Sequence, residues 1–292
     1  IPSNILIFKS LLTEQLKSAQ SLQVTGRWQE SVGAYTSLLE QFGPNAHILN
    51  GRGVSLRMLK HAALAITDFT QAKELAKTSG DQEQELTAIV GLIDAFRTGN
   101  RDPNFNPWPD VQPADLQQRL YQQAESYVVE AETLITQMPA GESIAKINAF
   151  TNFGLLYDNM ENPQKALESY AKAETIARQL IGTDPANIDF QNRLARTLTN
   201  KGVAEEKTGF SEEAWISQFE ALTIYLRLGD LRGVGNSMIS LGDVMNMLRN
   251  PNAARYLYEQ AREGSKKGGE IVDPDIHNLA ISRLTQLQLP QS

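Results

Sequence analysis

The residues of this sequence that could do chemistry are few and widely spaced. None of its three histidines, His47, His61 and His277, has a second histidine four residues away, so no helical metal-binding pair is present. The segment Asp273–Asp275 offers two carboxylates, but aspartate followed by proline is more typical of a helix start. No serine stands at a recognisable spacing from a base. The sequence therefore predicts no enzymatic activity, no cofactor and no metal.

Composition and charge exclude further classes of function. The 292 residues have a net charge of −7 and a pI of about 5.2, and no basic run exceeds the pair Lys266-Lys267, so a nucleic-acid partner is not expected. No apolar run approaches the ~20 residues of a membrane span, so membrane insertion is not expected. Cysteine is absent, which excludes disulfides and thiolate metal sites. We expect a cytoplasmic protein, although a chain without cysteine suits the periplasm or secretion equally well.

One spacing of small and aromatic residues recurs along the chain. A glycine is followed 12, 16 and 19 positions later by alanine, an aromatic residue and alanine. The three full matches are Gly53 with Ala65, Phe69 and Ala72, Gly154 with Ala166, Tyr170 and Ala173, and Gly242 with Ala254, Tyr258 and Ala261. The partial matches are Ala19 with Ser31, Tyr35 and Leu38, Gly202 with Ala214, Gln218 and Ala221, and Gly91 with a displaced triplet at Ala124, Val128 and Ala131.

This spacing predicts a helical hairpin. The leading small residue lets the first helix approach the second closely, the first alanine fits where the second helix presses back, the aromatic ring fills the gap to the next hairpin, and the last alanine admits the following repeat. A turn is expected seven residues after the leading position, at Gly26, Lys60, Glu161, Gly209 and Arg249. We expect the alanines at the start of each second helix to be buried at helix contacts, namely Ala166, Ala214 and Ala254.

These residues resemble the tetratricopeptide repeat, over roughly residues 12 to 265. The resemblance implies an all-α, right-handed solenoid of about six antiparallel hairpins, and we expect no sheet. The family period is ~34 residues. Here the leading glycines stand 38, 63, 48 and 40 residues apart, a long-repeat style that resembles repeats joined to bacterial signalling proteins.

The domain organisation follows from the repeats. The approximate repeats are 12–45, 46–80, 84–138 with an insertion at 98–113, 147–183, 195–229 and 235–268. Residues 1–11 form an N-terminal extension, and 270–292 form a C-terminal capping helix and tail that cover the last apolar face. The chain begins without Met, so we expect a fragment or a processed product.

Polar residues recur at the second and sixth positions of three repeats, counting the leading small residue as the eighth. They are Asn148 and Asn152, Arg196 and Asn200, and Asn236 and Ser240. Residues four apart share one side of a helix. The resemblance places this side in the concave groove, where such asparagines would bind the backbone of an extended peptide and Arg196 a carboxylate. The alternative is that these side chains are merely solvated.

The insertion at 98–113 is a second candidate for partner binding. Its four prolines forbid a regular helix. Phe105 and Trp108 are too apolar for a free loop, so they either pack on their own repeats or await a partner.

The sequence thus predicts a protein–protein interaction scaffold that binds a peptide or protein segment in its groove. We expect an adaptor or regulatory module of a larger bacterial signalling system, with oligomerisation possible. The alternatives are a self-assembling structural protein and a helical domain associated with an enzyme.

Overall fold

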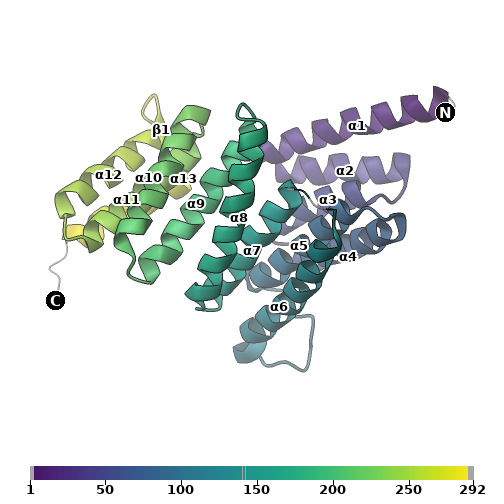
Figure 1. The fold of residues 1–292 in the computed structure, drawn as a ribbon, viewed down its shortest axis with the longest axis horizontal. Coiled ribbons are helices and arrows are strands. Elements are labelled where there is room, and N and C mark those ends of the chain that lie inside the picture. Colours follow the sequence, from purple (N-terminus) through teal and green to yellow (C-terminus); the bar gives the residue numbers. More distant parts are fainter. Residues whose placement is uncertain (1–2, 140, 142, 289–292) are drawn as a thin grey trace. The chain divides into compact units, whose positions relative to one another are not determined.

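The computed structural model describes residues 3–139, 141 and 143–288, which are almost entirely helical (Figure 1). They fall into two compact units that divide at residues 141 and 142. The first unit contains α1 Ser3–Val24, α2 Trp28–Phe42, α3 Ala46–Met58, α4 Ala62–Ser79, α5 Gln82–Thr98, a 3-10 turn at Gly99–Arg101 and α6 Pro113–Gln137. The second contains α7 Ile144–Asn159, α8 Pro163–Thr183, α9 Ile188–Lys207, α10 Ser211–Leu228, α11 Leu231–Met247, α12 Pro251–Gly264, β1 Lys266–Lys267, β2 Glu270–Ile271 and α13 Pro274–Gln288.

The helices pair in chain order, as the spacing predicted. In the first unit α1 packs on α2, α3 on α4 and α5 on α6. In the second unit α7 packs on α8, α9 on α10 and α11 on α12, and the hairpins stack so that α7 contacts α9 and α9 contacts α11. The described residues therefore form the six expected hairpins of an all-α helical repeat.

Each fully matched hairpin is closed by a glycine that contacts a ring. A methyl group added at Gly53, Gly154 or Gly242 would lie under 3.0 Å from the ring of Phe69, Tyr170 or Tyr258. These rings are at most 1% exposed. Ala166, Ala214 and Ala254 are each 0% exposed, which confirms their predicted burial.

The turns lie where the spacing placed them. The backbone of Lys60, Glu161 and Arg249 is left-handed, with φ of 64°, 56° and 58°, and the corresponding glycines Gly26 and Gly209 have φ of 72° and 82°. A left-handed residue outside glycine costs roughly 1–2 kcal/mol, so packing of the hairpins must stabilise these turns.

The expectation of no sheet was wrong at one place. β1 and β2 form an antiparallel hairpin of two residues each, after α12. Gly268 and Gly269 connect them with φ of 61° and 90°, and two consecutive left-handed residues make the tight turn that suits a β-hairpin.

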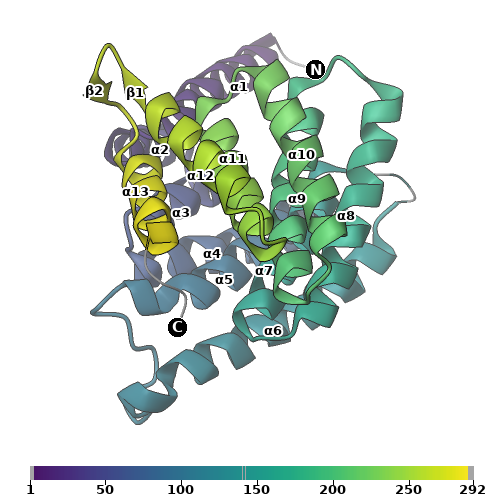
Figure 2. The same ribbon diagram turned by 90° about the vertical axis from the view of Figure 1, so that its left-hand side faces the viewer.

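The last helix covers the apolar end of the array, as predicted for the C-terminal segment. α13 packs on α11 and α12 (Figure 2). Ile276, Ala280 and Leu284 are 3%, 0% and 8% exposed and join the cluster that contains Tyr258. The part of this segment after Gln288 lies outside the described residues.

The glycine–ring contact can be tested with Gly242→Ala. The added methyl group overlaps the Tyr258 ring, which is buried and cannot move aside. We therefore expect the free energy of unfolding, measured by urea denaturation, to fall by about 1–3 kcal/mol. Gly182→Ala is the matched control, because nothing lies within 4 Å of its added methyl group in α8. That variant should be neutral or stabilised by up to ~1 kcal/mol, since alanine favours helix. Equal effects of the two changes would contradict the contact.

Candidate functional site

Four of the six predicted binding residues meet in one cavity of the second unit. Arg196 and Asn200 of α9 and Asn236 and Ser240 of α11 line a space of about 460 Å³. The remaining lining residues are Asn192, Thr199, Tyr225, Asp230, Arg232 and Gly233. The volume is in the range of small-ligand or side-chain pockets. We call it the basic cavity, for the charge described below.

Asn148 and Asn152 are not among the residues of this cavity. The Asn148 side-chain oxygen accepts a hydrogen bond of 2.7 Å from Nη1 of Arg193 on α9. The Asn152 amide donates to the backbone oxygen of Asn148 at 2.9 Å. These two amides therefore connect α7 to α9 and stiffen α7, and part of their hydrogen-bonding capacity is used within the protein.

The charge of the cavity is positive. Two arginines, Arg196 and Arg232, and one carboxylate, Asp230, line it, and Arg232 is also paired with Asp275, so the charge available to a ligand is that of Arg196. Arg196 is exposed and forms no ion pair within the described part of the chain. Burial lowers the pKa of the neighbouring Arg193, and the positive charge of Arg196 lowers it further, although Asp189 opposes this. The cavity therefore favours an anionic group.

The start of α11 places the second arginine. Asp230 precedes the helix, and its side chain accepts a hydrogen bond of 2.9 Å from the backbone N–H of Gly233, as expected of an N-cap. Arg232 pairs with Asp275 of α13 at 2.7 Å and approaches Asp273 at 3.8 Å. The charge of Arg232 is thus partly neutralised by α13, whereas Arg196 has no ion pair among the described residues and can bind a ligand.

Tyr225 and Gly233, which the repeat pattern did not identify, form the wall of the basic cavity between α9 and α11. Tyr225 of α10 is 6% exposed, and a methyl group at Gly233 would lie under 3.0 Å from its ring. Burial raises the pKa of its hydroxyl, partly offset by a hydrogen bond with Thr199. The glycine–ring contact inside the hairpins thus has a counterpart between hairpins, at the lining of the basic cavity.

Gln218 occupies the ring position of its repeat. It is 0% exposed, and its Nε2 donates to the backbone oxygen of Thr199 at 2.8 Å. Its Oε1 is buried without a hydrogen-bonding partner among the described residues. This hairpin is therefore closed by an amide contact at the level of the basic cavity.

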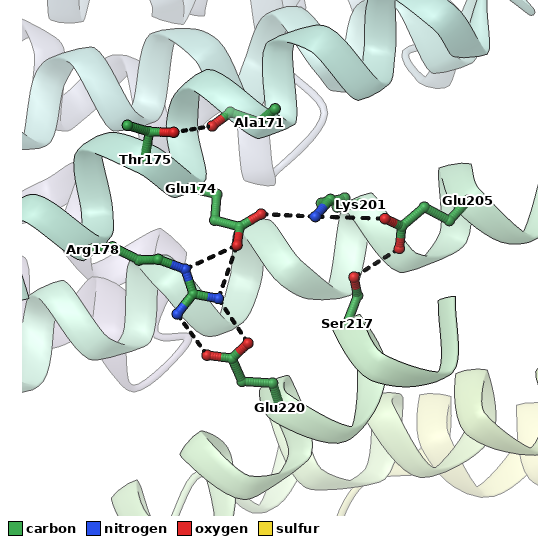
Figure 3. Close-up of polar contacts among 8 residues, drawn as sticks. All are labelled: Ala171, Glu174, Thr175, Arg178, Lys201, Glu205, Ser217 and Glu220. Atoms are coloured by element: carbon green, nitrogen blue, oxygen red, sulfur yellow. Dashed lines mark hydrogen bonds and ion pairs between the residues drawn. The ribbon is translucent and has the colours of Figure 1, made fainter. Parts of the chain in front are cut away.

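A chain of charged residues holds α9 between α8 and α10 (Figure 3). Lys201 lies 2.9 Å from Glu174 of α8 and 3.5 Å from Glu205 of its own helix. Glu205 accepts a hydrogen bond of 2.7 Å from Ser217 of α10, and Arg178 of α8 pairs with both Glu174 and Glu220 (Figure 3). Partly buried pairs of this kind fix which faces meet more than they add stability.

A second cavity lies at the C-terminal ends of α9 and α11, and we call it the acidic cavity. It encloses about 340 Å³ and is lined by Glu206, Asp243, Asn246, Met247, Tyr258, Arg283, Gln286 and Leu287. Asp243 accepts hydrogen bonds from the Tyr258 hydroxyl at 2.7 Å and from Nε of Arg283 at 2.8 Å. Burial raises the pKa of Glu206 to about 7, and the charge of Asp243 adds to the increase.

The insertion of the first unit packs largely on its own repeats. Phe105 is 6% exposed, with its ring centroid 6.3 Å from that of Phe96. Trp108 stacks on Phe96 at 6.1 Å and an interplanar angle of 25°, and the Arg119 guanidinium lies 5.5 Å from its ring. Of the two alternatives for Phe105, packing on its own unit is observed. Trp108 is half-buried and lines an open cavity of about 490 Å³.

In residues 3–139, 141 and 143–288, no group of three or more histidine, aspartate or glutamate side chains is placed to hold a metal ion. No helix in these ranges has the length and hydrophobicity needed to cross a bilayer.

Comparisons with known proteins establish the fold. No protein-family model matches the sequence, and no curated protein sequence matches it. Among solved structures, the Cut9–Hcn1 hetero-tetramer of the APC/C matches 95% of this chain with a TM-score of 0.62 and 13% identity. The apo form of RapI matches 95% with a TM-score of 0.61 and 14% identity. This chain spans 43% and 71% of those two chains.

Both matched structures are tetratricopeptide-repeat proteins. The expected fold is therefore confirmed: the chain has the all-α helical-repeat fold of tetratricopeptide-repeat structures.

The electrostatics of the acidic cavity predict a pH-dependent stability. The Glu206 carboxyl keeps its proton up to about pH 7 in the folded chain, whereas 4.5 is its ordinary pKa. Between these values the folded state binds more protons, so its stability falls as pH rises. Glu206→Gln removes this loss. We expect the variant and the parent to have the same unfolding free energy at pH 4. At pH 8 we expect that of the variant to be higher by only about 1 kcal/mol, because solvent screens the half-buried carboxylate.

Urea denaturation across this pH range measures the effect. Glu212→Gln is the matched control, because it makes the same charge change at an exposed position of α10. A difference between parent and Glu206→Gln that is the same at pH 4 and pH 8 would disprove the assignment.

Proposed function

We propose that this chain is a peptide-binding module, without enzymatic activity, that holds an extended segment ending in a carboxylate in the basic cavity. One observation supports this most directly: Arg196, Asn200, Asn236 and Ser240 come from two hairpins and line one cavity. An arginine and three side-chain amides, including Asn192, suit a segment that has an anionic group and an unpaired backbone.

The residues have separable roles in this proposal. The exposed Arg196 guanidinium has no ion pair among the described residues, so its parallel N–H groups can bind a carboxylate bidentately. Each asparagine can donate to a backbone carbonyl and accept from a backbone N–H, so it recognises the chain rather than a particular side chain. Affinity would come from both, and selectivity from neighbouring pockets.

The fold supports a role in assembly. The Cut9 chain that it matches is found in a hetero-tetramer with Hcn1, so this fold joins a protein partner there. By the resemblance of its long repeats, we further propose that the chain is the adaptor or regulatory part of a larger bacterial signalling system.

The test uses pools of randomised octapeptides, blocked at the N-terminus by fluorescein, with either a free carboxylate or an amide at the C-terminus. We expect the free-acid pool to bind more tightly by fluorescence anisotropy. Arg196→Gln should weaken that pool by about tenfold to a hundredfold, since a hydrogen bond to a charged group contributes about 1.5–3 kcal/mol. The amidated pool should be affected little.

Two controls accompany this test. Arg255→Gln removes an exposed arginine from α12 and should change neither pool. Asn200→Ala with Asn236→Ala should weaken both pools alike, because the amides contact backbone. If both pools bind equally and Arg196→Gln has no effect, the role of the carboxylate is refuted. If neither pool binds, the proposed function is refuted.

Self-assembly remains a second candidate because of one exposed surface on α10. Trp215 and Phe219 stack at 5.1 Å with their rings 8° apart, yet they are 39% and 50% exposed, and the adjacent Ile216 is 58% exposed. Contiguous exposed apolar groups of this kind often mark interfaces.

If this surface joins copies of the chain, the parent should sediment as an oligomer at micromolar concentration. Trp215→Ser with Phe219→Ser should then be a monomer with unchanged circular dichroism, because these side chains lie outside the core. A monomeric parent over the accessible concentration range would eliminate self-assembly.

A further inference from the structure

The two cavities of the second unit lie along the same faces of the same helices. On α9, Asn192 and Thr199 line the basic cavity, and Glu206 lines the acidic cavity seven residues further on. On α11, Asn236 and Asp243 have the same relationship. Seven residues complete nearly two helical turns, so these positions share one stripe on each helix, about 10 Å apart.

The two cavities carry opposite charge. In the acidic cavity two carboxylates, Glu206 and Asp243, stand against one arginine, Arg283, so its net charge is −1 when Glu206 is ionised (one minus two). In the basic cavity Arg196 is an arginine without a carboxylate partner among the described residues. The shared face is therefore polarised along the helix axes.

Within the acidic cavity the two carboxylates are not equivalent. Asp243 is neutralised by Arg283 and hydrogen-bonded by the Tyr258 hydroxyl. Glu206 is half-buried and lines the same space, and its carboxylate forms no hydrogen bond or ion pair in the described part of the chain. Burying a carboxylate without a partner is costly, so a cationic group entering this space would relieve the cost.

The rest of the lining fits a side chain with an apolar stem and a charged end. Met247 and Leu287 offer apolar contact, and Asn246 and Gln286 offer amide oxygens that accept from N–H groups. A volume of about 340 Å³ is large enough for the side chain of arginine or lysine and small for a globular partner.

We propose that the acidic cavity is a second subsite of the peptide groove, which receives a basic side chain of the same peptide whose carboxylate occupies the basic cavity. This inference rests on the proposed function. Arg196 and Glu206 are ten residues apart on α9, or about 15 Å along its axis, and the lining positions seven residues apart on each stripe are about 10 Å apart. Because an extended chain advances about 3.3 Å per residue, the basic residue stands three to five positions before the C-terminal carboxylate.

Glu206 couples this binding to protons. Besides burial, the charged groups that act on its carboxyl are Asp243 of α11, Arg283 of α13 and Lys207 of α9. Lys207 is itself held by Asp158 of α7 at 2.7 Å. A ligand cation lowers the pKa of Glu206 from about 7, so binding at pH 6.5 releases a proton and strengthens as pH rises from 6 to 8.

The experiment moves one arginine through a randomised peptide. N-terminally blocked octapeptide pools with a free carboxylate contain a single arginine at each of the second to seventh positions before the C-terminus, and no other basic residue. The blocked N-terminus ensures that only the side chain supplies the cation. We expect affinity to peak, by about tenfold, when the arginine is three to five positions from the carboxylate.

Two variants separate this inference from the function on which it rests. Glu206→Gln should abolish the peak and the pH dependence, while a further pool of the same design without any arginine binds as before. Folding of the variant is checked by the denaturation described above. Glu212→Gln should retain the peak. Arg196→Gln should weaken every free-acid pool.

The possible results each decide the question. A position-dependent peak that is lost in Glu206→Gln supports the subsite. A flat profile that still depends on the free carboxylate overturns the subsite and leaves the proposed function intact. Failure of all pools to bind overturns both.

Discussion

The contact between a glycine of one helix and a ring of the next is the constraint on which the structure depends. At Gly154 and Gly242 the approach leaves no room for a methyl group, so the two helices of each hairpin meet at a fixed height and rotation. Once that is fixed, positions four and seven residues away must face a common direction. The cavities between α9 and α11 are a consequence of this geometry, because their lining residues lie at such positions.

Most of the fold could be read from the sequence because the repeat is a packing rule expressed in residue size. Small residues and rings can be recognised without coordinates, and the same rule located the turns at Lys60, Glu161 and Arg249. The short β-hairpin could not be inferred from it, because Gly268 and Gly269 lie beyond Ala261, the last residue that the repeated spacing specifies.

The candidate site was partly predictable for a related reason. The repeat register predicts that Arg196 and Asn236 lie on the same face, since that depends only on how neighbouring hairpins stack, and both residues line the basic cavity. It could not foresee that Arg193 would bind the Asn148 side chain, or that Tyr225 would enter the wall from the second helix of the hairpin. The acidic cavity could not be predicted from the repeat pattern either, because Arg283 belongs to α13, which lies outside the repeats.

Gln218 has a consequence for how the site moves. In its hairpin an amide replaces the ring, and the side-chain oxygen is buried without a partner among the described residues. An uncompensated polar atom of this kind costs about 1–3 kcal/mol, and a side chain narrower than a ring gives its neighbours less contact. The packing between α9 and α10 at this residue should thus be looser than it would be with a ring. Because α9 contributes to both cavities, evolution could tune the plasticity of the whole groove at residue 218 without altering a residue that lines it.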